Sequence, residues 1–257
     1  MVRTLLIIAG AGFVLMLACF AGAAALGGPE LMRHGWNWTI LSDGHGGETF
    51  EPTGPRVTRQ LEWTGGDQLV VAVPADVTFV QGETATVEIN GPDNVVNRIT
   101  LAEGRLDFEP GYSPRGHMGF VGDEARVQIR ITAPDVSRFT VEGSGDLNLQ
   151  ALDLDTLDVQ VRGSGDVVAA GRADRLTLGI RGSGEAYLAD VAVRTATVDI
   201  SGSGEAELSP TESADVTING SGDVDLMRRP ANLNTQINGS GDVTVGGGDE
   251  PDADESF

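Results

Sequence analysis

The chain has 257 residues, enough for one large domain or two small ones, and a formal net charge of −21. Aromatic residues make up only 5%, so aliphatic side chains must fill the core. This acidity opposes binding to nucleic acid and to anionic lipid head groups. The single cysteine, Cys19, lies in an N-terminal apolar stretch, which excludes disulfides and thiolate chemistry from the rest of the chain.

The N-terminus is predicted to be a targeting segment. An uncharged apolar run at residues 5–26 follows Arg3 and ends in small residues. Residues 1–28 are therefore expected to act as a cleaved signal peptide, as a retained membrane anchor, or as a site of lipid attachment at Cys19. Each alternative exports the rest of the chain to the periplasm or the cell surface, and only this segment is expected to contact a membrane.

Three further stretches lack a regular repeat. Residues 29–55 are rich in Gly, His, Trp and Pro without periodicity, which is typical of a linker. Residues 56–134 contain short apolar runs that predict strands, and we expect them to form irregular leading coils that cap a repeat array. Residues 248–257 are acidic and are expected to form a disordered tail.

A repeat dominates the rest of the chain. Gly-Ser-Gly followed by an acid occurs six times, at successive intervals of 20, 19, 20, 18 and 19 residues. The six copies begin at Gly143, Gly163, Gly182, Gly202, Gly220 and Gly239. Apolar residues flank each copy at a spacing of two, which indicates strands with one buried face.

These repeats predict an all-β fold over residues 56–247, with the regular repeats in residues 135–247. One repeat cannot bury its apolar face alone, but stacked repeats can. We expect a right-handed parallel β-helix, or solenoid, of short coils that turn at Gly-Ser-Gly corners. A left-handed β-helix would show a six-residue subperiod, and none is visible.

The array resembles a known bacterial family. The segments LVVAVPADVTFVQGE, ITAPDVSRFTVEGSGDLNLQAL, VTINGSGDVDL and QINGSGDVTV are similar to the family described as putative auto-transporter adhesin, head GIN domain. The resemblance covers residues 61–245 and implies a β-helix-like fold on exported proteins. It carries no catalytic residues to this chain.

The acid of each repeat has two interpretations. The six carboxylates belong to Asp146, Asp166, Glu185, Glu205, Asp223 and Asp242. They could cap amides of their own turns, or they could form a calcium array. Because calcium needs six to eight oxygens and each turn offers one carboxylate, capping is the preferred interpretation.

The outward residues of the longer strand suggest a binding surface. They form two polar files, one through Thr140, Gln160, Gly179, Asp199, Thr217 and Gln236, and one through Glu142, Arg162, Arg181, Ser201, Asn219 and Asn238. The candidate binding residues are Gln160, Arg162, Arg181 and Asp199. The alternative is a solvated face on which Glu142, Arg162 and Arg181 neutralise one another.

The sequence favours a non-enzymatic cell-envelope protein without a cofactor. His34, His45 and His117 lack metal-ligand spacing, and no histidine recurs beside the repeated serines. The favoured function is adhesin-like binding of an extended partner, a glycan or an envelope protein, through the flat polar face. A structural scaffold without a specific ligand remains open, as does a polysaccharide-acting β-helix enzyme.

Overall fold

The computed structural model describes residues 54–63, 65–112 and 126–246 of the chain. They belong to a compact unit that spans residues 48–257. The predicted targeting segment, most of the predicted linker, the acidic tail, Cys19 and the three histidines lie outside the described residues. Within them, no helix is long and apolar enough to cross a membrane.

The described part contains fifteen strands, which form one continuous hydrogen-bonded sheet, and one short helix. The elements before the repeats are β1 (Arg56–Leu61), β2 (Gln68–Val71), β3 (Asp76–Gln81), β4 (Thr86–Pro92), α2 (Asp93–Val96), β5 (Ile99–Ala102), β6 (Arg105–Phe108) and β7 (Gln128–Ala133). The repeats supply β8 (Arg138–Gly143), β9 (Asp146–Gly163), β10 (Val167–Gly182), β11 (Glu185–Gly202), β12 (Glu205–Gly220), β13 (Asp223–Leu226), β14 (Asn232–Gly239) and β15 (Val243–Val245).

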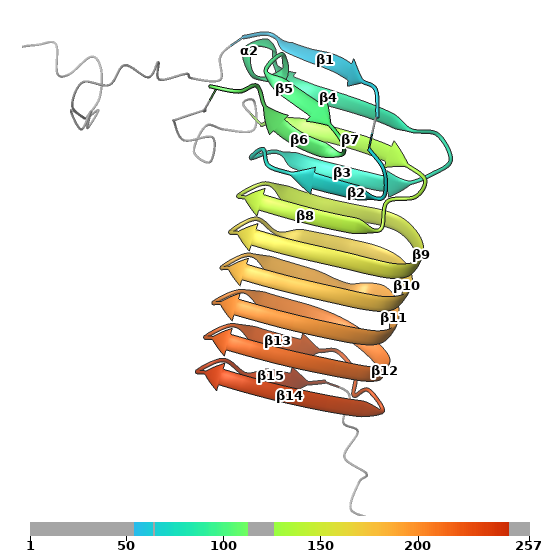
Figure 1. The fold of residues 1–257 in the computed structure, drawn as a ribbon, viewed down its shortest axis with the longest axis vertical. Helices are drawn as coiled ribbons and strands as arrows, with labels where there is room; N and C mark the ends of the chain where they lie inside the picture. The colour runs from blue at the N-terminus through green and yellow to red at the C-terminus, as the bar shows by residue number, and fades with distance from the viewer. Residues whose placement is uncertain (1–53, 64, 113–125, 247–257) are drawn as a thin grey trace, which may run out of the picture. The chain divides into compact units, whose positions relative to one another are not determined.

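The repeats form a solenoid of about five turns, which confirms the all-β solenoid prediction (Figure 1). Each long strand bends and supplies two arms. The first arm of β9 pairs with β3, and its second arm pairs with β8. All pairs between consecutive repeats are parallel. The first arms thus build one face of the solenoid, and the second arms build the other.

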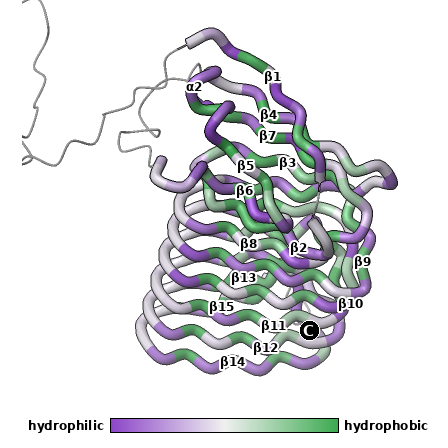
Figure 2. Tube along the Cα trace, turned by 45° about the horizontal axis from the view of Figure 1, so that its top comes forward, coloured by the Kyte–Doolittle hydropathy of each residue, from purple (hydrophilic) through white to green (hydrophobic). Residues whose placement is uncertain are grey.

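The core lies between the two faces. Hydrophobic and hydrophilic residues alternate along each strand, as Figure 2 shows, and the apolar ones point inward. In β9, Leu147 and Leu149 from the first arm and Leu157, Val159 and Val161 from the second arm are at most 1% exposed. The period-two pattern therefore places aliphatic side chains from both faces in one shared interior.

The Gly-Ser-Gly segments join the second arm of one coil to the first arm of the next. Each serine from Ser164 onward donates its backbone N–H to the carbonyl of the first glycine of the preceding segment, as Ser203 does to Gly182 at 2.9 Å. Within the described residues no hydroxyl of these serines makes a hydrogen bond. Backbone hydrogen bonds, and not the serine hydroxyls, therefore link the Gly-Ser-Gly segments of successive coils; we call each such layer of the stack a rung.

Residues 56–133 end the stack in a different way. The strands β2 and β3 form one coil that pairs in parallel with β8 and β9. Above it, β1 pairs with β4, β4 with β7, and β5 with β6, and all three pairs are antiparallel. Antiparallel strand pairs, which the repeats do not contain, therefore cover the first coil (Figure 1).

Candidate binding surface

The second arms carry the two polar files on their outward side. Strand pairing aligns Thr140 with Gln160, Gln160 with Gly179, Gly179 with Asp199, and so on to Gln236. The neighbouring file runs from Glu142 through Arg162, Arg181, Ser201 and Asn219 to Asn238 in the same register. Parallel stacking in register therefore brings the four candidate residues onto one surface, which we call the second-arm face.

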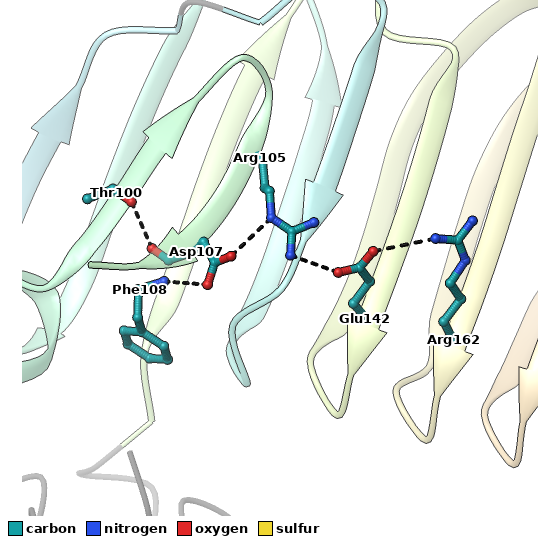
Figure 3. Close-up of polar contacts among 6 residues, drawn as sticks. All are labelled: Thr100, Arg105, Asp107, Phe108, Glu142 and Arg162. Atoms are coloured by element: carbon teal, nitrogen blue, oxygen red, sulfur yellow. Dashed lines mark hydrogen bonds and ion pairs between the residues drawn. The ribbon is translucent and has the colours of Figure 1, made fainter. Parts of the chain in front are cut away.

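Charges at the upper end of this face form a connected chain (Figure 3). Arg105, from β6, donates to Asp107 at 3.0 Å and to Glu142 at 2.8 Å. The other Glu142 oxygen lies 3.5 Å from Arg162. The hydrogen bond to Glu142 is the largest of the effects that raise the pKa of Arg105 above its usual value. One carboxylate thus serves two guanidinium groups, and Arg162 has the longer contact.

Arg181 differs from Arg162 because it makes no ion pair within the described residues. Its side chain is exposed, and its neighbours in the file are Arg162 and Ser201. The predicted mutual neutralisation of three charges therefore involves Glu142 and Arg162 but not Arg181. Arg181 is the candidate cation with the most freedom to bind an external oxygen.

Gln160 and Asp199 make local contacts on their own strands. The Gln160 amide donates to Asp158 at 2.7 Å. Its side chain lies over Gly179, where an added Cβ would stand 2.3 Å from Oε1 of Gln160. Asp199 accepts a long hydrogen bond of 3.4 Å from the Ser201 hydroxyl. These contacts orient the polar groups along the strand and leave them accessible.

The acid ladder bonds to the next coil. Oδ1 of Asp146 accepts the backbone N–H of Asp166 at 3.2 Å, Asp166 accepts from Glu185 at 3.0 Å, and Asp223 accepts from Asp242 at 2.8 Å. Where the ladder residue is Glu185 or Glu205, the next amide donates to a glycine carbonyl instead. The sequence predicted capping of amides in the same turn, whereas the donors lie one repeat further along the chain.

Like charges are close together along this ladder. Burial raises the pKa of Asp146, and the nearby carboxylates of Asp166 and Asp76 raise it further. Burial also raises the pKa of Glu205, with added repulsion from Glu185 and other acids. Among the residues that the structure describes, no group of three or more His, Cys, Asp or Glu could hold a metal ion.

The opposite, first-arm face carries an exposed patch that sequence reasoning missed. Val168 and Tyr187 are adjacent in register and are 44% and 38% exposed. The Tyr187 hydroxyl donates to Glu185, which is the main reason that its pKa is raised to about 12. The signal was present in the sequence, since both residues occupy outward positions of the first arm that are mostly polar in other repeats.

A groove of about 530 Å³ lies at the bends of the coils, away from both faces. It forms because β11 places four residues, 189–192, where β12 places only Ser209. Two of its arginines are already paired, Arg172 with Asp153 and Arg194 with Glu212. Sequence intervals of 20 and then 18 residues were the only advance sign of this hollow.

The chain belongs to a bacterial family that a family model identifies. The family model described as "putative auto-transporter adhesin, head GIN domain" matches residues 67–230, which is more than half of the chain. This description suggests an exported protein. The resemblance seen in the sequence is thereby confirmed, and no curated protein matches the chain.

A solved structure shares the fold of this chain, and two others align less closely. A crystal structure of a putative adhesin from Bacteroides fragilis NCTC 9343 aligns with a TM-score of 0.59 and 20% identity, over 75% of this chain and 98% of that chain. A putative adhesin from Parabacteroides distasonis ATCC 8503 aligns with a TM-score of 0.48 and 16% identity, over 75% of this chain and 98% of that chain. A putative lipid binding protein from the same organism aligns with a TM-score of 0.46 and 19% identity, over 74% and 96%.

Proposed function

We propose that this protein is a non-enzymatic, exported β-solenoid that binds an extended ligand, a glycan or a protein strand, across its second-arm face. The observation that carries the proposal is the register of the two polar files over six stacked second arms, from β8 to β14. Amide, hydroxyl, guanidinium and carboxylate groups repeat there at strand spacing, roughly 4.8 Å. A ligand with hydrogen-bonding groups at regular intervals can meet several of them at once.

Membership in an adhesin-like family supports a binding role. We further propose the domain division expected from the sequence, with an N-terminal targeting segment, a linker, the solenoid at residues 56–247 and an acidic tail. Right-handed winding and obligatory Gly-Ser-Gly corners belong to the same proposal. Location in the periplasm or at the cell surface follows from the targeting segment.

The test replaces Gln160, Arg162 and Arg181 together with Ser in the full chain. We expect binding to envelope glycans or envelope proteins to weaken about tenfold or more, because two guanidinium groups and an amide are lost. The thermal melt should change little, since exposed charge pairs contribute at most about 1 kcal/mol. Binding is measured on immobilised envelope fractions, with Arg181→Ser alone as the smallest change.

The matched control replaces Val168, Tyr187 and Glu207 with Ser, which are neighbours in register on the first-arm face. This variant should bind as the parent does. If this control variant loses binding while the second-arm variant still binds, the site lies on the first-arm face and our proposal is wrong. If neither variant binds less than the parent, a scaffold role is favoured, and hydrolysis of envelope polysaccharide would point to the groove at the bends.

A further inference from the structure

The C-terminal end of the solenoid is open. The strand β14 pairs with β12, and β15 pairs with β13, but no described strand pairs with their other edges (Figure 1). Ile237 stands in register with Ile218, and Ile218 is 0% exposed whereas Ile237 is 40% exposed. The last coil therefore exposes to solvent a side chain whose equivalents in the earlier coils are buried.

The N-terminal end differs in its edge strand, β1, which also has no described partner on its outer side but carries two arginines. Arg59 of the outermost strand, β1, donates to the carbonyls of Val96 at 3.1 Å and Ile99 at 2.9 Å. Its guanidinium thus ties the edge strand to α2 and β5. Arg56 donates to the Asn90 side chain at 2.7 Å. This end carries charges that discourage pairing with another chain.

The open end lacks such protection. Residues 231–246 include only one charged side chain, Asp242, in a chain whose net charge is −21. The edge strand Asn232–Gly239 has neither a charge nor a proline, the usual features that block strand addition. Residues 247–257, which follow, carry five acids and Pro251 and are poor material for a covering strand. The end is therefore the place where two acidic chains meet with least repulsion.

The edge strand is also self-complementary. Residues 232–238 read Asn-Leu-Asn-Thr-Gln-Ile-Asn, which is chemically the same in both directions about Thr235. In an antiparallel pair centred on Thr235, each residue meets one of its own kind. A two-fold axis requires this kind of self-matching surface. We propose that β14 pairs antiparallel with β14 of a second copy, with Thr235 on the two-fold axis.

Pairing of the two strands would cover the apolar side chains that the single copy exposes and would supply donors to its amide oxygens. Leu233 faces Ile237 of the partner subunit on the inward side, which continues the aliphatic core from one copy to the other. On the outward side, amide groups face amide groups. Asn238 already donates to Asn219 at 3.0 Å, and Asn234 donates to Asp215 at 3.3 Å. Their carbonyl oxygens are left to accept from the partner's amides.

A cysteine at the two-fold axis tests this arrangement. The variant Thr235→Cys is made in the full chain with Cys19→Ser, so that the new thiol is the only one. Directly opposed residues of an antiparallel pair lie close enough for a disulfide after mild oxidation. We expect a species of twice the 26.8 kDa chain mass on a non-reducing gel. Thr197→Cys, an exposed position inside the stack, is the matched control; it should form no cross-link and should run at the mass of a single chain on the same gel.

The mass of the native protein provides the second readout. The parent chain in mild detergent should sediment as a dimer at micromolar concentration, and Ile237→Lys should convert it to a monomer with an unchanged circular dichroism spectrum. Thr197→Lys should remain a dimer. A monomeric parent without a Thr235→Cys cross-link would overturn the proposal. So would a dimer that survives Ile237→Lys, or a dimer that appears only when residues 247–257 are removed.

Discussion

Gly202 lies where one coil passes close to the previous coil. Its φ is +137°, and a Cβ added there would stand 2.2 Å from the carbonyl oxygen of Gly182. That oxygen is also the acceptor for Ser203 N–H. A side chain at this position must therefore break the contact between two rungs as well as strain its own backbone.

We expect Gly202→Val to destabilise the solenoid by about 3 kcal/mol or more, because strain at such a φ alone costs about 1–3 kcal/mol. Chemical denaturation is the appropriate measurement. Ser203→Ala is the control, since its exposed hydroxyl makes no hydrogen bond within the described residues, and it should unfold at the parent midpoint. If the two variants unfold together, the Gly-Ser-Gly segments are not obligatory corners.

The side chain of Asp166 accepts a hydrogen bond from the backbone N–H of Glu185, and this bond needs an oxygen atom but not a negative charge. Replacing Asp166 with Asn keeps an oxygen for the Glu185 amide and removes one of several repelling charges, so Asp166→Asn should match or exceed the parent stability. Asp166→Ala should cost about 1 kcal/mol, the typical net value of one hydrogen bond. Urea midpoints rank the variants. Glu205→Ala should not lower the midpoint, because the next amide, that of Asp223, donates to Gly204 instead. Equal midpoints for Asp166→Asn and Asp166→Ala would contradict this role.

At the scale of the element, the repeat predicts which side chains are buried and which face outward, but it does not predict what the outward side chains bind. The alternation at Leu157, Val159 and Val161 identified three side chains that are 0% exposed. The two polar files also followed from the sequence, because parallel stacking aligns equivalent positions of successive repeats. The binding assigned to Gln160, Arg162, Arg181 and Asp199 stays a prediction.

Other features could not be predicted because they depend on segments outside the repeat. Arg105 comes from β6 and contacts Glu142, which is 37 residues away and follows no fixed spacing. The coil formed by β2 and β3 lies between β7 and the repeats, although β7 follows it in sequence by more than forty residues. Periodicity reports which face of a strand is buried, but not which distant strand lies beside it.

At the scale of the whole molecule, the crowding of carboxylates should make stability depend on pH. The pKa values of Asp146 and Glu205 are raised in the folded state, chiefly by burial. The folded state therefore binds protons more readily than the unfolded state, and its stability falls as pH rises through these folded pKa values. Arg194 lowers the pKa of Glu212, and the stability that this pair contributes is lost only at lower pH.

We expect the melting temperature to rise as the pH is lowered from 7 through the raised pKa values of Asp146 and Glu205, and to fall in stronger acid. Added salt should raise the melting temperature at pH 7 and have less effect at pH 5, because it screens the same repulsion. Glu205→Gln should reduce the pH dependence. A melting temperature that does not rise as the pH is lowered from 7 would show that neither burial nor repulsion of these carboxylates destabilises the folded state.

The direction of the hydrogen bonds between coils has a mechanical consequence. They run along the axis of the stack, so a force that separates its two ends pulls along these bonds, and the coils can separate one after another. Among the repeats, β14 and β15 have fewer paired residues than β9, β10 and β11 have with one another, so peeling of the repeats would begin there. Each coil of 18 to 20 residues would then release about 65 Å of extended chain. Under tension the repeats would therefore lengthen in nearly equal steps.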